Sequence, residues 1–140
     1  MPADQAQRAS PDALLSLAKK EGRGHLKIFL GAAPGVGKTY AMLSSAHAEK
    51  SAGRDVVAGL IETHGRRETE QLTDGFETLP RNPIVYRNQV MQEFDLDGAL
   101  TRRPSLLLVD EYAHTNVPGS RHPKRWQDVD ELLAAGIDVW

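Results

Sequence analysis

Short apolar runs alternate along the chain with longer segments that favour helix. The runs are rich in leucine, isoleucine and valine, and they predict strands over residues 26–30, 55–62, 83–87, 105–111 and 137–140. The segments between them predict helices over residues 40–50, 68–79 and 125–135, and one more within residues 92–103. Because a strand, a helix and a strand in succession form a right-handed crossover, this order predicts an α/β fold, a three-layer sandwich with a mostly parallel sheet. Pro83 cannot donate to a strand ladder, so its strand is expected at the periphery.

The two ends of the chain carry separate expectations. Residues 10–12, Ser-Pro-Asp, form a helix start, so we expect a polar tail and a helix within residues 1–23, ahead of a nucleotide-binding domain over residues 24–140. The apolar run at the other end reaches the last residue of the sequence. We expect it to begin a strand of a truncated sheet, which would leave an unpaired apolar edge at residues 106–109 and 137–140.

A glycine-bearing loop joins the first predicted strand to the first long helix. Residues 31–39, GAAPGVGKT, follow the pattern of a phosphate-binding loop, except that alanine replaces its first glycine. The glycines let backbone N–H groups converge on an anion, and a helix that begins at Lys38 adds its positive end. Lys38 would contact the β- and γ-phosphates of ATP, and the Thr39 hydroxyl would bind Mg²⁺. The candidate nucleotide-binding residues of this P-loop are Ala32, Ala33, Pro34, Gly35, Val36, Gly37, Lys38 and Thr39.

A second pattern with chemical meaning lies where the strand predicted near residues 105–109 runs into Asp110 and Glu111. Downstream of a phosphate loop, such a strand end is typical of the second half of a P-loop NTPase-like site, and Asp110 would hold Mg²⁺ through water. Glu111 is the candidate catalytic residue, a general base for an attacking water; the alternative is that it only caps a helix or pairs with an arginine. Adjacent side chains of a strand leave on opposite faces, so the magnesium is assigned to Asp110 alone.

Two polar segments are expected at the same edge of the sheet. Residues 63–67 bring hydroxyl, imidazole and guanidinium groups to a strand end, where they either contact phosphate or only form a turn into the next helix. The loop over residues 112–124 follows the acidic pair, and Arg121 is a candidate to stabilise phosphate charge; the alternative is an ordinary surface loop. His114 and His122 lack a third ligand at suitable spacing, which argues against a transition-metal site.

Composition narrows the classes of function. The 140 residues are 40% hydrophobic and 26% charged with a formal net charge of −2, which suits one globular domain and offers no basic footprint for nucleic acid. The absence of cysteine excludes disulfides, thiol catalysis and cysteine-bound zinc. No apolar run approaches the roughly twenty residues of a membrane helix, so we expect this chain to be soluble and not inserted in a membrane.

Three runs of sequence resemble the N-terminal cytoplasmic domain of the KdpD family, the potassium- and osmotic-responsive sensor histidine kinases. They are LKIFLGAAPGVGKTYAML at residues 26–43, ETHGR at residues 62–66 and LLVDEYAHTNVPGSRHPKRWQ at residues 107–127. The resemblance implies an ATP-binding regulatory and sensor domain of a two-component system for potassium-transport genes, with residues 32–39 as the ATP loop and Asp110 in the second nucleotide motif. The family also carries alanine at position 32.

The resemblance also implies the surroundings of the domain. The parent would be an inner-membrane kinase with this domain in the cytoplasm, and its phosphorylated histidine and kinase core would lie outside this chain. The partners implied are ATP, the rest of the kinase, which can form a homodimer, and indirectly its response regulator. Three hypotheses follow: a module in which ATP occupancy biases a two-state element, an autonomous ATPase that uses Glu111, and a docking surface that needs no nucleotide.

Overall fold

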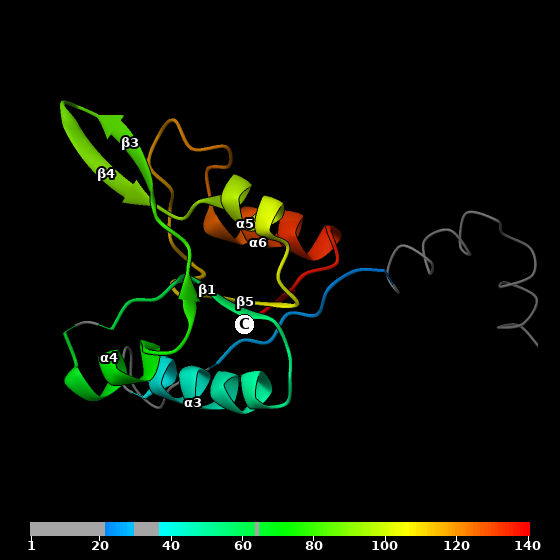
Figure 1. The fold of residues 1–140 in the computed structure, drawn as a ribbon. Helices are drawn as coiled ribbons and strands as arrows, with labels where there is room; N and C mark the ends of the chain where they lie inside the picture. The colour runs from blue at the N-terminus through cyan, green and yellow to red at the C-terminus, as the bar shows by residue number, and fades with distance from the viewer. Residues whose placement is uncertain (1–21, 30–36, 64) are drawn as a thin grey trace, which may run out of the picture.

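The computed structural model describes residues 22–29, 37–63 and 65–140, in which a parallel sheet lies between two layers of helices (Figure 1). The helices are α3 (Lys38–Ser51), α4 (Arg67–Thr73), α5 (Leu96–Arg102) and α6 (Arg125–Ala134). The strands are β1 (Val56–Leu60), β2 (Glu77–Thr78), β3 (Asn82–Tyr86), β4 (Gln89–Glu93), β5 (Leu106–Val109) and β6 (Asp138–Val139). The predicted α/β class with a mostly parallel sheet is confirmed. The helix predicted to start at Pro11 lies outside the described residues.

The main sheet has the strand order β2-β1-β5-β6, and all its neighbouring strands are parallel. Beyond β6 the chain near Leu26 continues this pairing, since Lys27 donates to the carbonyl of Val139 (3.0 Å) and Val139 donates to that of His25 (3.0 Å). β6 therefore lies inside the sheet, with partners on both sides. The expectation of an unpaired apolar edge at residues 106–109 and 137–140 is wrong, because β6 inserts between β5 and the start of the described chain.

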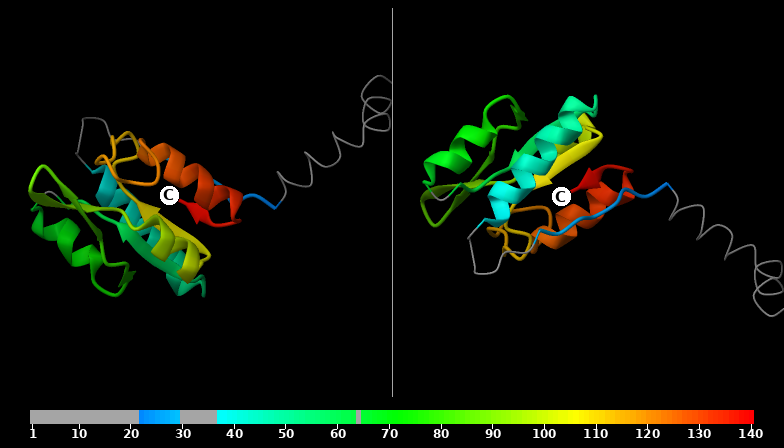
Figure 2. Two further views of the ribbon diagram at one scale, coloured as in Figure 1. Left: turned by 90° about the horizontal axis from the view of Figure 1, so that it is seen from above. Right: turned by 90° about the horizontal axis from the view of Figure 1, so that it is seen from below.

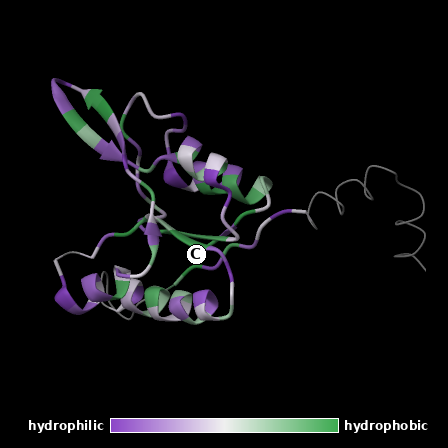
Figure 3. Ribbon diagram, in the orientation of Figure 1, coloured by the Kyte–Doolittle hydropathy of each residue, from purple (hydrophilic) through white to green (hydrophobic). Residues whose placement is uncertain are grey.

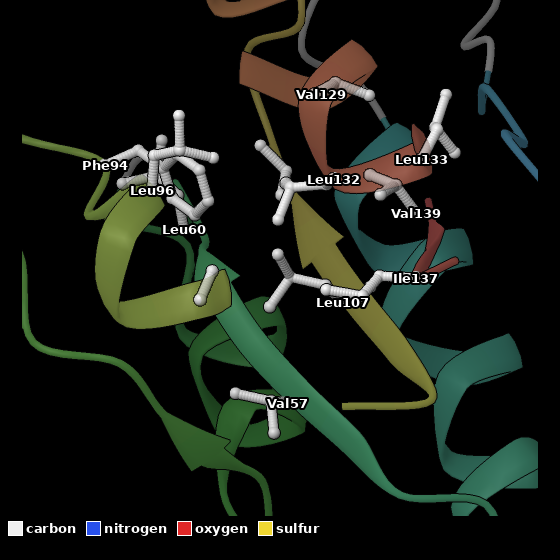
Figure 4. Close-up of a cluster of buried hydrophobic side chains, with 12 residues drawn as sticks. Val57, Leu60, Phe94, Leu96, Leu107, Val129, Leu132, Leu133, Ile137 and Val139 are labelled. Carbon is white, nitrogen blue, oxygen red and sulfur yellow. The ribbon is translucent and has the colours of Figure 1, made fainter. Parts of the chain in front are cut away.

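Alternate residues of the strands supply two cores, one on each face of the sheet, as the period of two in a strand requires. The face covered by α5 and α6 carries the cluster drawn in Figure 4, and Figure 3 shows the central strands of the sheet as largely hydrophobic. That cluster consists of Val57, Leu60, Phe94, Leu96, Ala99, Leu107, Val109, Val129, Leu132, Leu133, Ile137 and Val139. The face covered by α3 buries Met42, Leu43, Ala46, Val56, Ala58, Phe76, Leu106 and Leu108. The helices on the two faces are seen from above and from below in Figure 2.

The helix predicted over residues 68–79 is shorter in the structure. α4 ends at Thr73, and Gly75 follows with a φ of 90°, a left-handed conformation that glycine adopts without strain. The chain then turns into the two-residue strand β2, which pairs with β1. Phe76 is buried beneath this turn among residues of α3 and β1. Burial of its aromatic ring stabilises the turn, and the helix ends earlier than predicted.

β3 and β4 form a separate antiparallel hairpin that projects from the sandwich (Figure 1). The predicted peripheral strand at residues 83–87 is therefore present, but it lies outside the main sheet and its partner β4 was not predicted. Two residues, Arg87 and Asn88, connect the strands with φ angles of 50° and 61°, the arrangement of a type I′ turn. The helix predicted within residues 92–103 begins only at Leu96, where the Asp95 carboxylate accepts a hydrogen bond from the backbone N–H of Gly98 (3.1 Å).

No helix in the described part of the chain has both the length and the apolar character needed to cross a bilayer.

Candidate functional site

The candidate site lies at the carboxyl edge of the sheet, where Asp110 follows the last residue of β5. A side-chain oxygen of Asp110, Oδ2, accepts hydrogen bonds from the Thr39 hydroxyl (3.3 Å) and from the backbone N–H of Glu62 (2.9 Å). Thr39 belongs to the first turn of α3, and Glu62 follows β1. The fold thus brings together the two predicted magnesium ligands, which are 71 residues apart in the sequence.

The backbone of the sheet fixes where Asp110 stands. Its N–H donates to the carbonyl of Leu60 (2.9 Å), which extends the pairing of β1 and β5 beyond the last residue of β5. The register between these strands shifts at Gly59, where a side chain would lie 3.0 Å from atoms of Leu107 and Phe94. A side chain at this position would require Leu107 and Phe94 to move by a few tenths of an ångström, so glycine favours the close approach of the end of β1 to the residue that carries the carboxylate.

Asp110 is 5% exposed, and burial raises the pKa of its carboxyl group. This pKa is lowered by the hydrogen bonds from Glu62 and Thr39 and by the charge of Lys38. The negative charge of the neighbouring Glu111 raises it. A carboxylate that loses hydration by burial is stabilised by an adjacent cation. The geometry therefore favours a positive charge beside the Thr39 and Asp110 oxygens.

The start of α3 supplies the positive side of the site. Gly37 precedes the helix with a φ of 73° and has no side chain to cap the first turn, and that turn contains no acidic residue. The backbone N–H groups of a 14-residue helix are thus directed at the site, which favours an anion there. Lys38 lines a pocket together with Asp110, Glu111, Tyr112 and Trp140, and residues of the segment 26–29 also contribute to it.

These residues fit a magnesium–triphosphate group. Mg²⁺ takes oxygen ligands and is held in proteins by one or two carboxylates together with substrate phosphates. Asp110 supplies such a carboxylate, and the Thr39 hydroxyl lies 3.3 Å from it. Within the described ranges no group of three or more His, Cys, Asp or Glu side chains is arranged to hold a metal ion. The remaining predicted loop residues, Ala32, Ala33, Pro34, Gly35 and Val36, lie outside the described residues.

Glu111 has a φ of 58°, a left-handed conformation that costs a non-glycine residue roughly 1–2 kcal/mol. β5 ends at Val109, so the expected opposition of the Asp110 and Glu111 side chains across a strand does not apply. Glu111 lines the pocket of Lys38 and also a second pocket, which it shares with Glu62, Glu93 and Arg125 among others. It therefore stands between the two pockets.

The structure does not bring Arg121 to this site. Its guanidinium pairs with Asp97 (2.5 Å) and with Glu131 (2.5 Å), and it lines a pocket that shares no residue with the pocket of Lys38. His122 also pairs with Glu131 (2.9 Å). These contacts hold the loop over residues 112–124 against α5 and α6, so phosphate binding by Arg121 stays a prediction that the geometry does not favour.

The segment over residues 63–67 leads into α4. The Thr63 hydroxyl donates to the Glu70 carboxylate (3.3 Å), and the backbone N–H of Arg66 donates to the Thr63 carbonyl (3.1 Å). The backbone bond is that of a turn that leads into a helix, as in the second of the two readings of this segment, and the side-chain bond ties Thr63 to α4. His64 lies outside the described residues.

Arg125 belongs to the site, although the sequence analysis placed it only at the start of a helix. It is 3% exposed, and its Nη1 donates to the backbone carbonyls of Asp110 (3.1 Å) and Glu111 (3.3 Å). Its Nη2 lies 3.5 Å from the carboxylate of Glu93. The spacing of residues in the sequence indicates that Arg125 is buried, because it lies four residues before the buried Val129 and therefore on the apolar stripe of α6.

Comparison with known proteins places the chain among sensor domains. Residues 22–140 match the family model described as KdpD, osmosensitive K⁺ channel His kinase sensor domain. The chain is 54% identical over 133 residues to the sensor protein KdpD of Escherichia coli K12, and this covers 95% of the chain and 15% of that protein. It is 56% identical over 117 residues to the KdpD of Mycobacterium tuberculosis CDC 1551, covering 84% of the chain and 14% of the relative.

A third relative, the sensor protein KdpD of Clostridium acetobutylicum, is 51% identical over 138 residues, which covers 96% of the chain and 15% of that protein. The chain thus spans about one seventh of the length of these curated relatives.

Proposed function

This chain belongs to the KdpD family of sensor domains, and from that membership and the geometry of the site we propose that it binds ATP with Mg²⁺ as a regulatory module. The observation that carries the proposal is the contact between the Thr39 hydroxyl and the buried Asp110 carboxylate, at the start of a helix whose N-cap residue, Gly37, has no side chain to cap it. Asp110 and Lys38, a carboxylate for a metal and an ammonium for phosphates, line the same pocket.

Each residue has a defined task in this proposal. The N–H groups of α3 and the Lys38 ammonium would bind phosphate oxygens, and the ammonium would act as a point charge. The Thr39 hydroxyl would bind Mg²⁺, and Asp110 would hold it through water. Bound Mg²⁺ supplies positive charge that neutralises the β- and γ-phosphates. Burial of Asp110 restricts water around its carboxylate, which strengthens its attraction for the cation.

The proposed parent is a sensor histidine kinase of a two-component system that controls potassium-transport genes, with this domain on the cytoplasmic side of an inner-membrane protein. ATP occupancy would bias a two-state element of the domain, and the rest of the kinase, a homodimer, would respond to that bias. The response regulator is then an indirect partner. This assignment rests on the family, since the chain covers a small part of the relatives.

One observation favours a second candidate, an autonomous ATPase. Glu111 follows the proposed magnesium residue directly and lines the pocket of Lys38, where a general base for an attacking water is required. Steady release of phosphate by the purified domain would favour this candidate over the module. A docking surface that works without nucleotide becomes the better proposal if ATP does not bind at all.

The test of the proposal is an ATP titration of the wild-type chain, with and without Mg²⁺, beside the Lys38→Ala variant. Loss of the charge-assisted phosphate contact should weaken Mg-ATP binding by about 1.5–3 kcal/mol, roughly ten- to a hundredfold. Lys50→Ala is the matched control, because Lys50 lies in the last turn of the same helix and contacts the carbonyl of Gly75. Equal ATP affinity in folded wild-type and Lys38→Ala chains would overturn the assignment.

A further inference from the structure

We infer that Arg125 is a positioning residue of the nucleotide site, which acts by holding the backbone of Asp110 and Glu111 in place. The inference rests on the proposed function, because it concerns the carboxylate assigned there to Mg²⁺. Arg125 itself would touch neither nucleotide nor metal. Its contacts explain how the end of β5 keeps the shape that points Asp110 at Thr39.

The buried position of the Arg125 guanidinium at the start of a helix is energetically unfavourable. Arg125 is the first residue of α6, where the helix dipole disfavours positive charge, and only 3% of the residue is exposed. Burial lowers the pKa of its guanidinium, and its Nε atom has no hydrogen-bond partner among the described residues. A buried cation persists only where nearby acceptors replace its hydration. The charge of Glu93, 5% exposed, opposes the effect of burial on this pKa.

The acceptors of Nη1 are two consecutive backbone carbonyls, those of Asp110 (3.1 Å) and Glu111 (3.3 Å). Carbonyls of adjacent residues on an extended strand point in opposite directions, so they can share one donor only where the chain turns. The turn is made by the left-handed φ of 58° at Glu111. Arg125 thus stabilises a strained backbone at the residue that follows the proposed magnesium carboxylate.

Two further contacts close a ring around this turn. The N–H of His114 donates to the carbonyl of Glu111 (3.0 Å), and the N–H of Arg125 donates to the carbonyl of His114 (3.0 Å). The carboxylate of Glu93, the last residue of β4, lies 2.9 Å from Nε2 of His114 and 3.5 Å from Nη2 of Arg125. The position of Asp110 is therefore tied to the base of the β3–β4 hairpin and to the start of α6.

The shape of the guanidinium matters in this arrangement. Arg125 directs one nitrogen at the two carbonyls and another at Glu93, a planar fork that a lysine ammonium cannot reproduce. Arg125→Lys keeps the positive charge and loses the planar fork. Arg125→Met keeps much of the apolar stem and loses the charge as well as the fork. Glu93→Gln leaves Arg125 in place and removes its charged partner.

A purely structural role for Arg125 predicts something different. Loss of a buried ion pair would then lower the stability of the whole domain and accelerate amide exchange throughout. A positioning role instead predicts a local effect on the backbone N–H of Glu62, because this N–H donates to the Asp110 carboxylate and so reports where the carboxylate stands. Val57, at the other end of β1 within the parallel sheet, serves as the reference amide.

The experiment measures amide exchange by NMR without nucleotide, and then ATP affinity with and without Mg²⁺, in wild type and in the three variants. Arg102→Met is the matched control, because Arg102 pairs with Asp55 and Glu77 and so loses ion pairs that do not involve Asp110. In Arg125→Met and Arg125→Lys we expect the Glu62 amide to lose protection relative to Val57. Mg-ATP affinity should fall by about 10- to 100-fold, as for residues that orient metal ligands, while Mg-free ATP affinity stays within about twofold.

Glu93→Gln should show the same pattern with a smaller amplitude, and it keeps the test valid if both Arg125 variants fail to fold. Unchanged Glu62 protection and unchanged Mg-ATP affinity in the folded variants would overturn the inference, and so would equal losses with and without Mg²⁺. If the wild-type chain binds no ATP, the affinity measurement refutes the proposed function. The exchange of the Glu62 amide still decides whether Arg125 positions Asp110.

Discussion

Replacement of Asp110 by asparagine separates the binding role of this residue from its effect on stability. The carboxylate is 5% exposed, and burial raises its pKa above the usual value of 3.8. Asparagine has nearly the same shape, and its carbonyl oxygen can still accept the hydrogen bond from the N–H of Glu62. The substitution therefore removes a charge and leaves the local packing in place.

The expected effects have opposite signs. A carboxylate that orients Mg²⁺ through water should cost about 10- to 100-fold in Mg-ATP affinity when it is lost, or roughly 1.4–2.8 kcal/mol, while Mg-free binding is spared. Without nucleotide the variant should be as stable as wild type or more stable at neutral pH, because a charge that burial disfavours has been removed.

The pH dependence follows from the direction of the shift. Because the pKa of Asp110 is higher in the folded than in the unfolded chain, the folded state binds more protons between the two values. The contribution of Asp110 to the stability of the folded state is thus greatest below pH 3.8, and it is lost as the pH rises through the pKa that Asp110 has in the folded chain. Asp110→Asn should remove this fall in stability.

The assays are calorimetric ATP titration with and without Mg²⁺ and urea unfolding across a pH series. Asp97→Asn is the control, since it makes the same chemical change in an exposed side chain that pairs with Arg121. The reasoning would be refuted by Mg-ATP affinity equal to wild type, or by an apo variant that is clearly less stable than wild type at neutral pH. The second result would mean that the carboxylate stabilises the fold through its hydrogen bonds.

Two further predictions concern catalysis and the core. The Glu111→Gln variant should bind ATP as wild type does. If wild type releases phosphate steadily and the variant does not, the domain is an ATPase. Negligible phosphate release by both proteins supports the regulatory module. Leu107→Ala, at a fully buried position, should lower the unfolding free energy by about 2–5 kcal/mol, and Val85→Ala, 72% exposed on the hairpin, by no more than about 0.5 kcal/mol. Urea unfolding checks the pair, and similar losses for both would contradict the assigned core.

The β3–β4 hairpin shows where local pattern is insufficient. Residues 83–87 were predicted as a strand, but the first four residues of β4 are all exposed and its apolar residues Val90 and Met91 are adjacent, so no alternation identifies this strand. The two-residue turn uses Arg87 and Asn88 at positive φ without the glycine that usually marks such turns. Only the pairing of the two strands stabilises this geometry, so local propensity could not predict it.

The site was predictable to the extent that its chemistry is local. The continuous apolar runs at β1 and β5 and the helical segments α3 and α6 were predictable from the sequence, whereas β2 and β4 were not. Lys38, Thr39 and Asp110 were identified as candidate ligands by their positions relative to these elements. Long-range packing places β6 inside the sheet, pairs Arg121 with Asp97 and Glu131, and brings Arg125 to the backbone of Asp110, and none of these contacts could be predicted from local pattern. The physical reason is that apolar period and turn chemistry act over a few residues, whereas the partner of a buried charge is chosen by which distant segments pack against each other.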